Sequence, residues 1–175
     1  MAVLCPALPI NGRTVVHGHL FVHGQPLNES GMQNHPLTPM TDANLLRVME
    51  KQASGECGLI PLSCIQAGKH AIQAQLIALQ QAGKRYAVLD ALTDADLMTL
   101  AASLPEDVLL TGGSGLAGAL AASQPHNPMR EDQAIPAREG NSVVLAGSCS
   151  LMTNQQVARY RQTAPAKAID VERAV

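Results

Sequence analysis

Short apolar runs alternate with amphipathic stretches from Gly55 onward. The apolar runs predict three buried strands, at residues 57–62, 86–89 and 108–110. A helix is predicted after each strand: one from about residue 66 to Gly83, one from Thr93 to Pro105, and a small-residue helix ending near residue 122. Because strands and helices alternate, the sequence predicts a layered α/β domain with a largely parallel sheet.

The first 54 residues follow a different pattern. A short strand is predicted at residues 3–5 and a long one at 13–23, because apolar and polar positions alternate there. This alternation places one set of side chains on a common face: His17, His19, Phe21 and His23. Residues 28–40 have no periodicity, so we expect a long loop there, followed by a helix that carries Leu45, Leu46 and Met49.

Residues 123–141 mark the clearest change in composition, with three prolines, scattered charges and no apolar stripe. The sequence therefore predicts a first domain at 1–122, a linker at 123–141 and the start of a second domain at 142–175. Beyond the linker we expect a strand at 142–146, a helix at 153–161 opened by a capping box of Thr153 and Gln156, and a strand at 166–170. One β-α-β unit cannot cover both faces of its own sheet, so it is predicted to begin a second α/β domain.

Composition excludes several classes of partner. Twelve Lys and Arg against 14 Asp and Glu give a net charge of -2, which provides no basic surface for nucleic acid or an anionic membrane. Aromatic residues make up 2% of the 175 residues, so the core must be aliphatic. The four cysteines form no C-x-x-C pair and no signal segment is apparent, so we expect a cytoplasmic protein with no membrane or nucleic-acid partner.

Two glycine- or serine-rich turns follow predicted strands. Residues 113–118 spell G-x-G-x-x-G, which fits a dinucleotide site, a close packing of helix on strand, or an anion site at a helix N-terminus to which Ser114 adds a hydroxyl. No strand with a terminal acid follows soon after, which weakens the dinucleotide alternative. Residues 147–150 form the second turn, which is either structural or a phosphate contact. Cys149 has no histidine after it in the chain, so we do not expect a nucleophile there.

Three further features carry candidate chemistry. Asp90 ends a predicted strand at the carboxyl edge of the sheet, where it contacts a ligand or caps the following turn. His35 lies in the long loop, where a ligand contact and an exposed imidazole are equally consistent with the sequence. The alternating histidines contain an H-x-H pair, but no acid nearby has ligand spacing, so we predict a polar face and no metal site.

The motifs together resemble the four-carbon acid sugar kinase family, most closely its 3-oxo-tetronate kinase branch. The resemblance covers the whole chain in order. It rests on Arg13 with Gly18-His19, on residues 35–40 (HPLTPM), on 111–117 (TGGSGLA), and on 147–150 (GSCS) with Thr153 and Gln156.

The resemblance implies a cytoplasmic two-domain kinase that transfers the γ-phosphoryl group of ATP, bound with Mg²⁺, to the terminal hydroxyl of a four-carbon sugar acid. The first domain of such kinases binds the acid and the second binds the nucleotide. Nucleotide contacts are then expected from Gly147, Ser148 and Ser150. Substrate contacts are expected from His35, Asp90, Gly113, Ser114 and Gly115.

Two motifs of these kinases are absent from the chain: the Asp-Asp-x-Thr-Gly-Ala segment, whose aspartate is the candidate base, and the Gly-Gly-[Asp/Glu]-Thr segment of the nucleotide pocket. We therefore expect an internal fragment without kinase activity, with no catalytic base assigned. The alternatives are a non-catalytic sugar-acid-binding module and a fragment of a dinucleotide-dependent oxidoreductase. Open strand edges in a fragment predict self-association.

Overall fold

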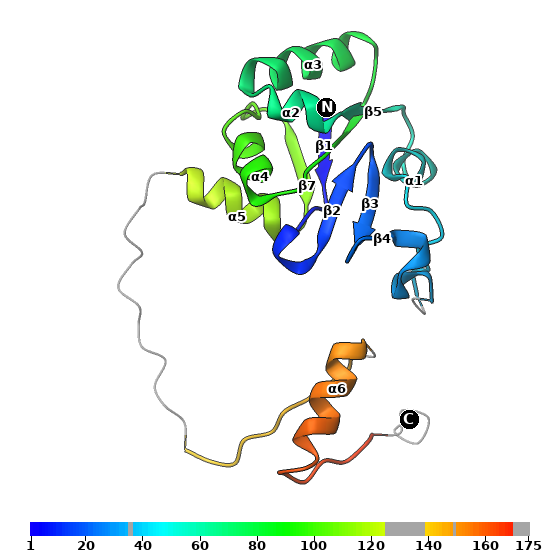
Figure 1. The fold of residues 1–175 in the computed structure, drawn as a ribbon, viewed down its shortest axis with the longest axis vertical. Helices are drawn as coiled ribbons and strands as arrows, with labels where there is room; N and C mark the ends of the chain where they lie inside the picture. Colours follow the sequence, from blue (N-terminus) through cyan, green and yellow to red (C-terminus); the bar gives the residue numbers. More distant parts are fainter. Residues whose placement is uncertain (35–36, 125–138, 149, 170–175) are drawn as a thin grey trace. The chain divides into compact units, whose positions relative to one another are not determined.

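A four-stranded parallel sheet forms the centre of the first part of the molecule (Figure 1). Its strands are β1 (Ala2–Cys5), β5 (Cys57–Ile60), β6 (Tyr86–Leu89) and β7 (Leu109–Gly112), in the order β5-β6-β1-β7. The structure is a computed structural model that describes residues 1–34, 37–124, 139–148 and 150–169. It divides into two compact units, Met1–Pro128 and Met129–Val175. The predicted layered α/β fold is confirmed.

Helices cover the two faces of this sheet unequally (Figure 1). Four helices contact one another on one face: α2 (Leu62–Gln66), α3 (Lys69–Gln81), α4 (Asp94–Ala101) and α5 (Ser114–Ser123). The other face carries α1 (Leu45–Gln52), which packs against β5 and β6. The helix predicted from about residue 66 to Gly83 is confirmed as α3, which begins at Lys69 because Gly68, with a φ of 91°, separates it from the short helix α2. The preceding strand ends at Ile60, because Pro61 caps α2.

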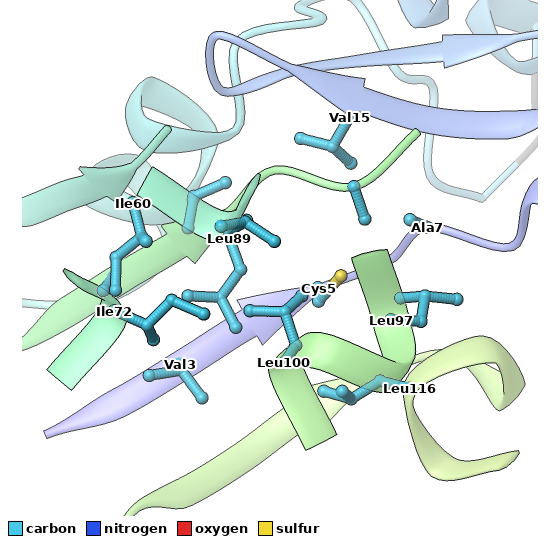
Figure 2. Close-up of a cluster of buried hydrophobic side chains, with 14 of the residues drawn as sticks. Val3, Cys5, Ala7, Val15, Ile60, Ile72, Leu89, Leu97, Leu100 and Leu116 are labelled. Carbon is cyan, nitrogen blue, oxygen red and sulfur yellow. The ribbon is translucent and has the colours of Figure 1, made fainter. Parts of the chain in front are cut away.

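The core lies between the sheet and the four-helix face, and it is aliphatic as the composition requires. Figure 2 shows Val3 of β1 and Leu89 of β6 beside Ile72 of α3 and Leu100 of α4. All four side chains are fully buried. Thr93 and Asp96 form a capping box that starts α4, so its apolar residues enter the core at a fixed point.

The predicted long strand at 13–23 is wrong: these residues form a hairpin. Strands β2 (Arg13–Val16) and β3 (His19–Val22) pair antiparallel, and β3 also pairs with β4 (Gln25–Pro26). The turn residues His17 and Gly18 have φ angles of 49° and 71°, the left-handed pair that a tight two-residue hairpin requires. A two-residue turn leaves the alternation of apolar and polar positions intact, so periodicity alone did not show the reversal. The histidines at 17, 19 and 23 therefore do not share one strand face.

The segment after the hairpin contains short 3-10 turns, Leu27–Glu29 and Gly31–Asn34, within the expected long loop. Ser30 is buried, and its hydroxyl donates to the Leu27 carbonyl at 2.7 Å. His35 lies outside the described residues. The helix predicted around residues 45–49 is confirmed as α1, and the Asn44 side chain caps it by accepting from the Arg47 amide.

The second unit contains one helix among its described residues, α6 (Leu151–Tyr160). The strand predicted at 142–146 is not formed, and Val143, Val144 and Leu145 are exposed. Residues 166–169 of the other predicted strand are also irregular. The helix begins earlier than predicted, because Ser150 rather than Thr153 is its N-cap. Strands need neighbours for their backbone groups, and the described residues of this unit provide none.

The glycines of the G-x-G-x-x-G segment differ in what surrounds them. A Cβ at Gly115 would overlap the Ala7 carbonyl oxygen and lie 3.1 Å from Leu97 Cδ1. A Cβ at Gly118, on the same helix, would meet nothing within 4 Å. Close packing of α5 against the chain after β1 therefore explains Gly115, and leaves Gly118 without a packing role.

We predict that Gly115→Ala lowers the free energy of unfolding by about 1–3 kcal/mol, because the backbone oxygen of Ala7 cannot move aside. The matched control is Gly118→Ala, which should leave stability unchanged or raise it by up to about 1 kcal/mol through helix propensity. Urea unfolding followed by circular dichroism measures both. Equal effects of the two substitutions would contradict the packing explanation.

Candidate functional site

The carboxyl ends of three neighbouring strands bring candidate residues to one edge of the sheet (Figure 1). β6 is followed by Asp90, β1 by Pro6 and Ala7, and β7 by Gly113 and the first turn of α5. Ligands of open α/β sheets bind at this edge, because the loops there are free to vary while the strands hold them in place. The structure therefore brings Asp90 and the Ser114 turn to the same edge.

Asp90 is fully buried, and its carboxylate is occupied by backbone donors. Its Oδ2 accepts from the amides of His17 at 2.8 Å and Leu62 at 3.0 Å. Its Oδ1 accepts from the amide of Gly18 at 2.9 Å. One side chain thus joins the end of β6 to the hairpin turn and to the first residue of α2.

This geometry favours a structural role for Asp90 over direct contact with a ligand, but these bonds hold the hairpin turn and the start of α2 rather than the turn that follows Asp90. Next to it, Val15 and Ala91 exchange two backbone hydrogen bonds of 2.9 Å, which attach β2 to the end of β6. A buried carboxylate that accepts three amide bonds satisfies donors that would otherwise be unpaired. Asp90 accordingly determines where the hairpin lies against the sheet edge.

The turn that opens α5 is exposed and has room for a ligand. Gly113 is the N-cap, and no side chain caps the helix. A Cβ at Gly113 would approach only the Pro6 carbonyl oxygen, at 3.9 Å. Ser114 is exposed, whereas Gly115 is half-buried against Ala7. Free amides at a helix N-terminus attract anions, and the Ser114 hydroxyl adds a donor.

An apolar cavity of about 160 Å³ lies beside this turn. The ends of β1 and β7 form one wall, with Leu4, Cys5 and Thr111, and α1 forms the other, with Leu45 and Met49. Burial raises the pKa of the Cys5 thiol to about 11. The thiol is therefore neutral near pH 7, and Cys5 is a packing residue rather than a nucleophile.

A polar depression of about 460 Å³ lies over the hairpin and the start of α1. Arg47 donates through Nε and Nη2 to the two carboxylate oxygens of Asp42, at 2.9 and 2.7 Å. These bonds hold the pKa of Asp42 well below its usual range. His19 donates through Nδ1 to the His17 carbonyl at 2.8 Å. Its Nε2 therefore accepts from the side-chain amide nitrogen of Asn44, at 3.3 Å. Sequence reasoning missed this cluster, because only the hairpin brings His19 to Asn44.

The predicted nucleotide residues lie at the start of α6. Gly147 and Ser148 are exposed. Ser148 Oγ accepts from the Ser150 amide at 3.2 Å, and Ser150 Oγ accepts from the Thr153 amide at 3.1 Å. Small exposed residues at the N-terminus of a ten-residue helix suit phosphate oxygens. Cys149 lies outside the described residues.

Among residues 1–34, 37–124, 139–148 and 150–169, no three His, Cys, Asp or Glu side chains are grouped so as to hold a metal ion. In the same part of the chain, no helix has the length and apolar character to cross a bilayer.

The sheet, its covering helices and the open turn at the carboxyl edge define an α/β ligand-binding domain. Residues 1–120 match a family model described as the sugar-binding N-terminal domain, and the chain belongs to this family.

Relatives extend the match to nearly the whole chain. The chain is 50% identical to a 3-oxo-tetronate kinase of Pectobacterium atrosepticum, covering 98% of this chain and 41% of that protein. A solved structure from Salmonella typhimurium LT2 matches with 50% identity and a TM-score of 0.73, covering 98% of this chain and 40% of that one. A Bordetella bronchiseptica structure, a domain-swapped dimer with bound citrate, matches with 32% identity and a TM-score of 0.55, covering 69% and 28%.

These findings confirm the resemblance to 3-oxo-tetronate kinases that the sequence motifs indicated. The chain spans about two-fifths of the length of the curated relatives it matches.

We predict that Asp90→Asn lowers the free energy of unfolding by about 2–4 kcal/mol, because an amide cannot accept all three of these N–H groups as a carboxylate does. The control is Asp94→Asn in the exposed first turn of α4, which should cost about 0.5 kcal/mol. Urea unfolding of both variants measures the difference. A loss at Asp90 no greater than that at Asp94 would show that the carboxylate does not hold the turns.

Proposed function

We propose that the first unit binds a four-carbon sugar acid, 3-oxo-tetronate or a related tetronate, at the carboxyl edge of its sheet. The observation that carries the proposal is the N-terminal turn of α5, which no side chain caps and in which Gly113 and Ser114 are exposed and Gly115 is half-buried. A tetronate carboxylate is an anion with the charge that such a turn attracts. The family description of residues 1–120 as sugar-binding agrees with this assignment.

The chemistry of relatives supports an acid as the ligand. Those that match the chain at about 50% identity are named 3-oxo-tetronate kinases. The Bordetella bronchiseptica relative has bound citrate, another small hydroxylated carboxylic acid. On this proposal Asp90 is a positioning residue that holds the hairpin against the site, and its carboxylate does not touch the acid.

We further propose that the second unit carries part of an ATP site, at Gly147, Ser148 and Ser150. Gly147, Ser148 and Ser150 are small and exposed at the N-terminus of α6, and the two serine hydroxyls that cap its first amides could also donate to phosphate oxygens. ATP, bound with Mg²⁺, supplies the γ-phosphoryl group in this family's reaction. Phosphoryl transfer depends on positioning and charge neutralisation by many groups at once. A chain that spans two-fifths of its relatives therefore acts as a binding fragment of a kinase.

We predict saturable binding of threonate, erythronate or 3-oxo-tetronate to the full chain by isothermal titration calorimetry, without ATP. Ser114→Ala should weaken the affinity about fivefold, the effect of losing one hydrogen bond. The matched control is Ser123→Ala at the other end of α5, whose hydroxyl donates to the Leu120 carbonyl; its affinity should be unchanged. Absence of heat with all three acids, or equal effects of the two substitutions, would reject the site.

We predict no ATP turnover by the chain above a no-enzyme blank, with 3-oxo-tetronate as acceptor in a coupled assay. The relative from Pectobacterium atrosepticum, which is named 3-oxo-tetronate kinase, serves as the positive control. Turnover by this chain would disprove the binding-fragment proposal while leaving the acid site itself intact.

A further inference from the structure

β7 forms an unprotected edge of the parallel sheet. All four of its residues are exposed, with Leu109 at 69% and Leu110 at 36%. The opposite edge, β5, is covered: Cys57 and Ile60 are 5% and 0% exposed, and α1 and α3 pack on the strand. The two edges of one sheet therefore differ sharply in how much apolar surface they leave to solvent.

Backbone groups of β7 that point away from β1 are available for pairing. The Leu109 amide donates to the Met1 carbonyl at 3.3 Å, so Leu109 and Thr111 direct their backbone groups toward β1. In a parallel pair the intervening residues direct theirs to the other side. The amides and carbonyls of Leu110 and Gly112 thus lie on the outer edge, in line with the Val108 carbonyl.

Natural edge strands are usually protected by a charged side chain, a proline or a bulge. Residues 108–114 (VLLTGGS) contain no charge and no proline, and β7 pairs with β1 without an interruption in register. Charged residues lie next to the strand rather than on it. Glu106 and Asp107 precede it, and the uncapped N-terminus of α5 follows it.

We propose that β7 pairs antiparallel with β7 of a second copy of the chain, about a twofold axis at Leu110. In this register the two Leu110 residues exchange both backbone hydrogen bonds, and the Gly112 amide meets the Val108 carbonyl of the other copy. On the face away from the core, Leu109 lies opposite Thr111 of the second copy. The two parallel sheets then form one continuous sheet.

Charge decides between the two directions of pairing. In the antiparallel register Glu106 and Asp107 of each copy lie opposite Gly113 and Ser114 of the other, at the positive end of α5. The dimer therefore competes with the acid of the proposed function for this turn. In a parallel register the acids of the two copies would lie side by side and repel. A four-residue edge buries little surface, so the dimer is weak, with a dissociation constant above about 1 μM.

Sedimentation equilibrium of the full chain tests the proposal. The mass should rise from 18.4 kDa toward twice that value between about 1 and 500 μM protein. Leu109→Lys should weaken dimerisation at least tenfold, because it places a charge on the paired edge. The matched control is Ile77→Lys, a similarly exposed apolar residue on α3, which should leave the association unchanged.

A second variant and a second readout test the register. Asp107→Lys leaves the strand itself intact and should weaken the dimer several-fold, because it reverses the charge opposite α5. Amide hydrogen exchange should slow at Leu110 and Gly112, and not at Leu109, as concentration rises. The proposal is overturned if the chain is monomeric at every concentration. It is also overturned if Leu109→Lys leaves the dimer intact, which is the result expected for a dimer formed by exchange of whole units.

Discussion

The buried carboxylate of Asp90 is the interaction on which the carboxyl edge of the sheet depends. It sits at the end of β6 and accepts amide bonds from the hairpin turn at His17 and Gly18 and from the start of α2 at Leu62. Three segments that are far apart in sequence are thereby held at one point. The hairpin in turn positions α1, since the Leu45 amide donates to the Gly18 carbonyl and the Asn44 side chain contacts His19. The apolar cavity between α1 and β1 exists because these turns are held in place.

Close backbone approach sets the geometry of the neighbouring turn. Gly112 and Gly115 lie against the carbonyl groups of Cys5 and Ala7, so that a side chain at either position would collide with the chain leaving β1. Gly113, between them, is free of such contact. The same run of glycines therefore serves two purposes: two of them let α5 and β7 pack tightly, and one leaves an open helix N-terminus. The acid site that we propose lies at this open turn, within the residues that match the sugar-binding family.

Two apolar segments in the described ranges of the molecule lack strand partners for some or all of their backbone groups. Within the part of the chain that the structure describes, β7 pairs with one strand, β1, and its residues are exposed. Residues 143–145, an apolar run in the second unit, are exposed and irregular where a strand was expected. The physical reason is the same in both places. A strand is stable only when its amides and carbonyls find partners, and these segments lack some or all of them among the described residues. Open edges of this kind favour association with another chain.

The sequence by itself determined the elements whose signals are local. β6 was predicted to the residue, β1 to within one residue, and α4 from Thr93, where its capping box lies. The aliphatic core followed from the composition, and the family from motifs at 111–117 and 147–150. Tertiary structure alone decided the hairpin at 13–23, the role of Asp90, and the absence of strands from the described residues of the second unit. Periodicity reports which residues share a face, but it does not report a chain reversal that preserves the alternation. Nor does it report which donors surround a buried carboxylate, because both depend on segments that meet only after the chain has folded.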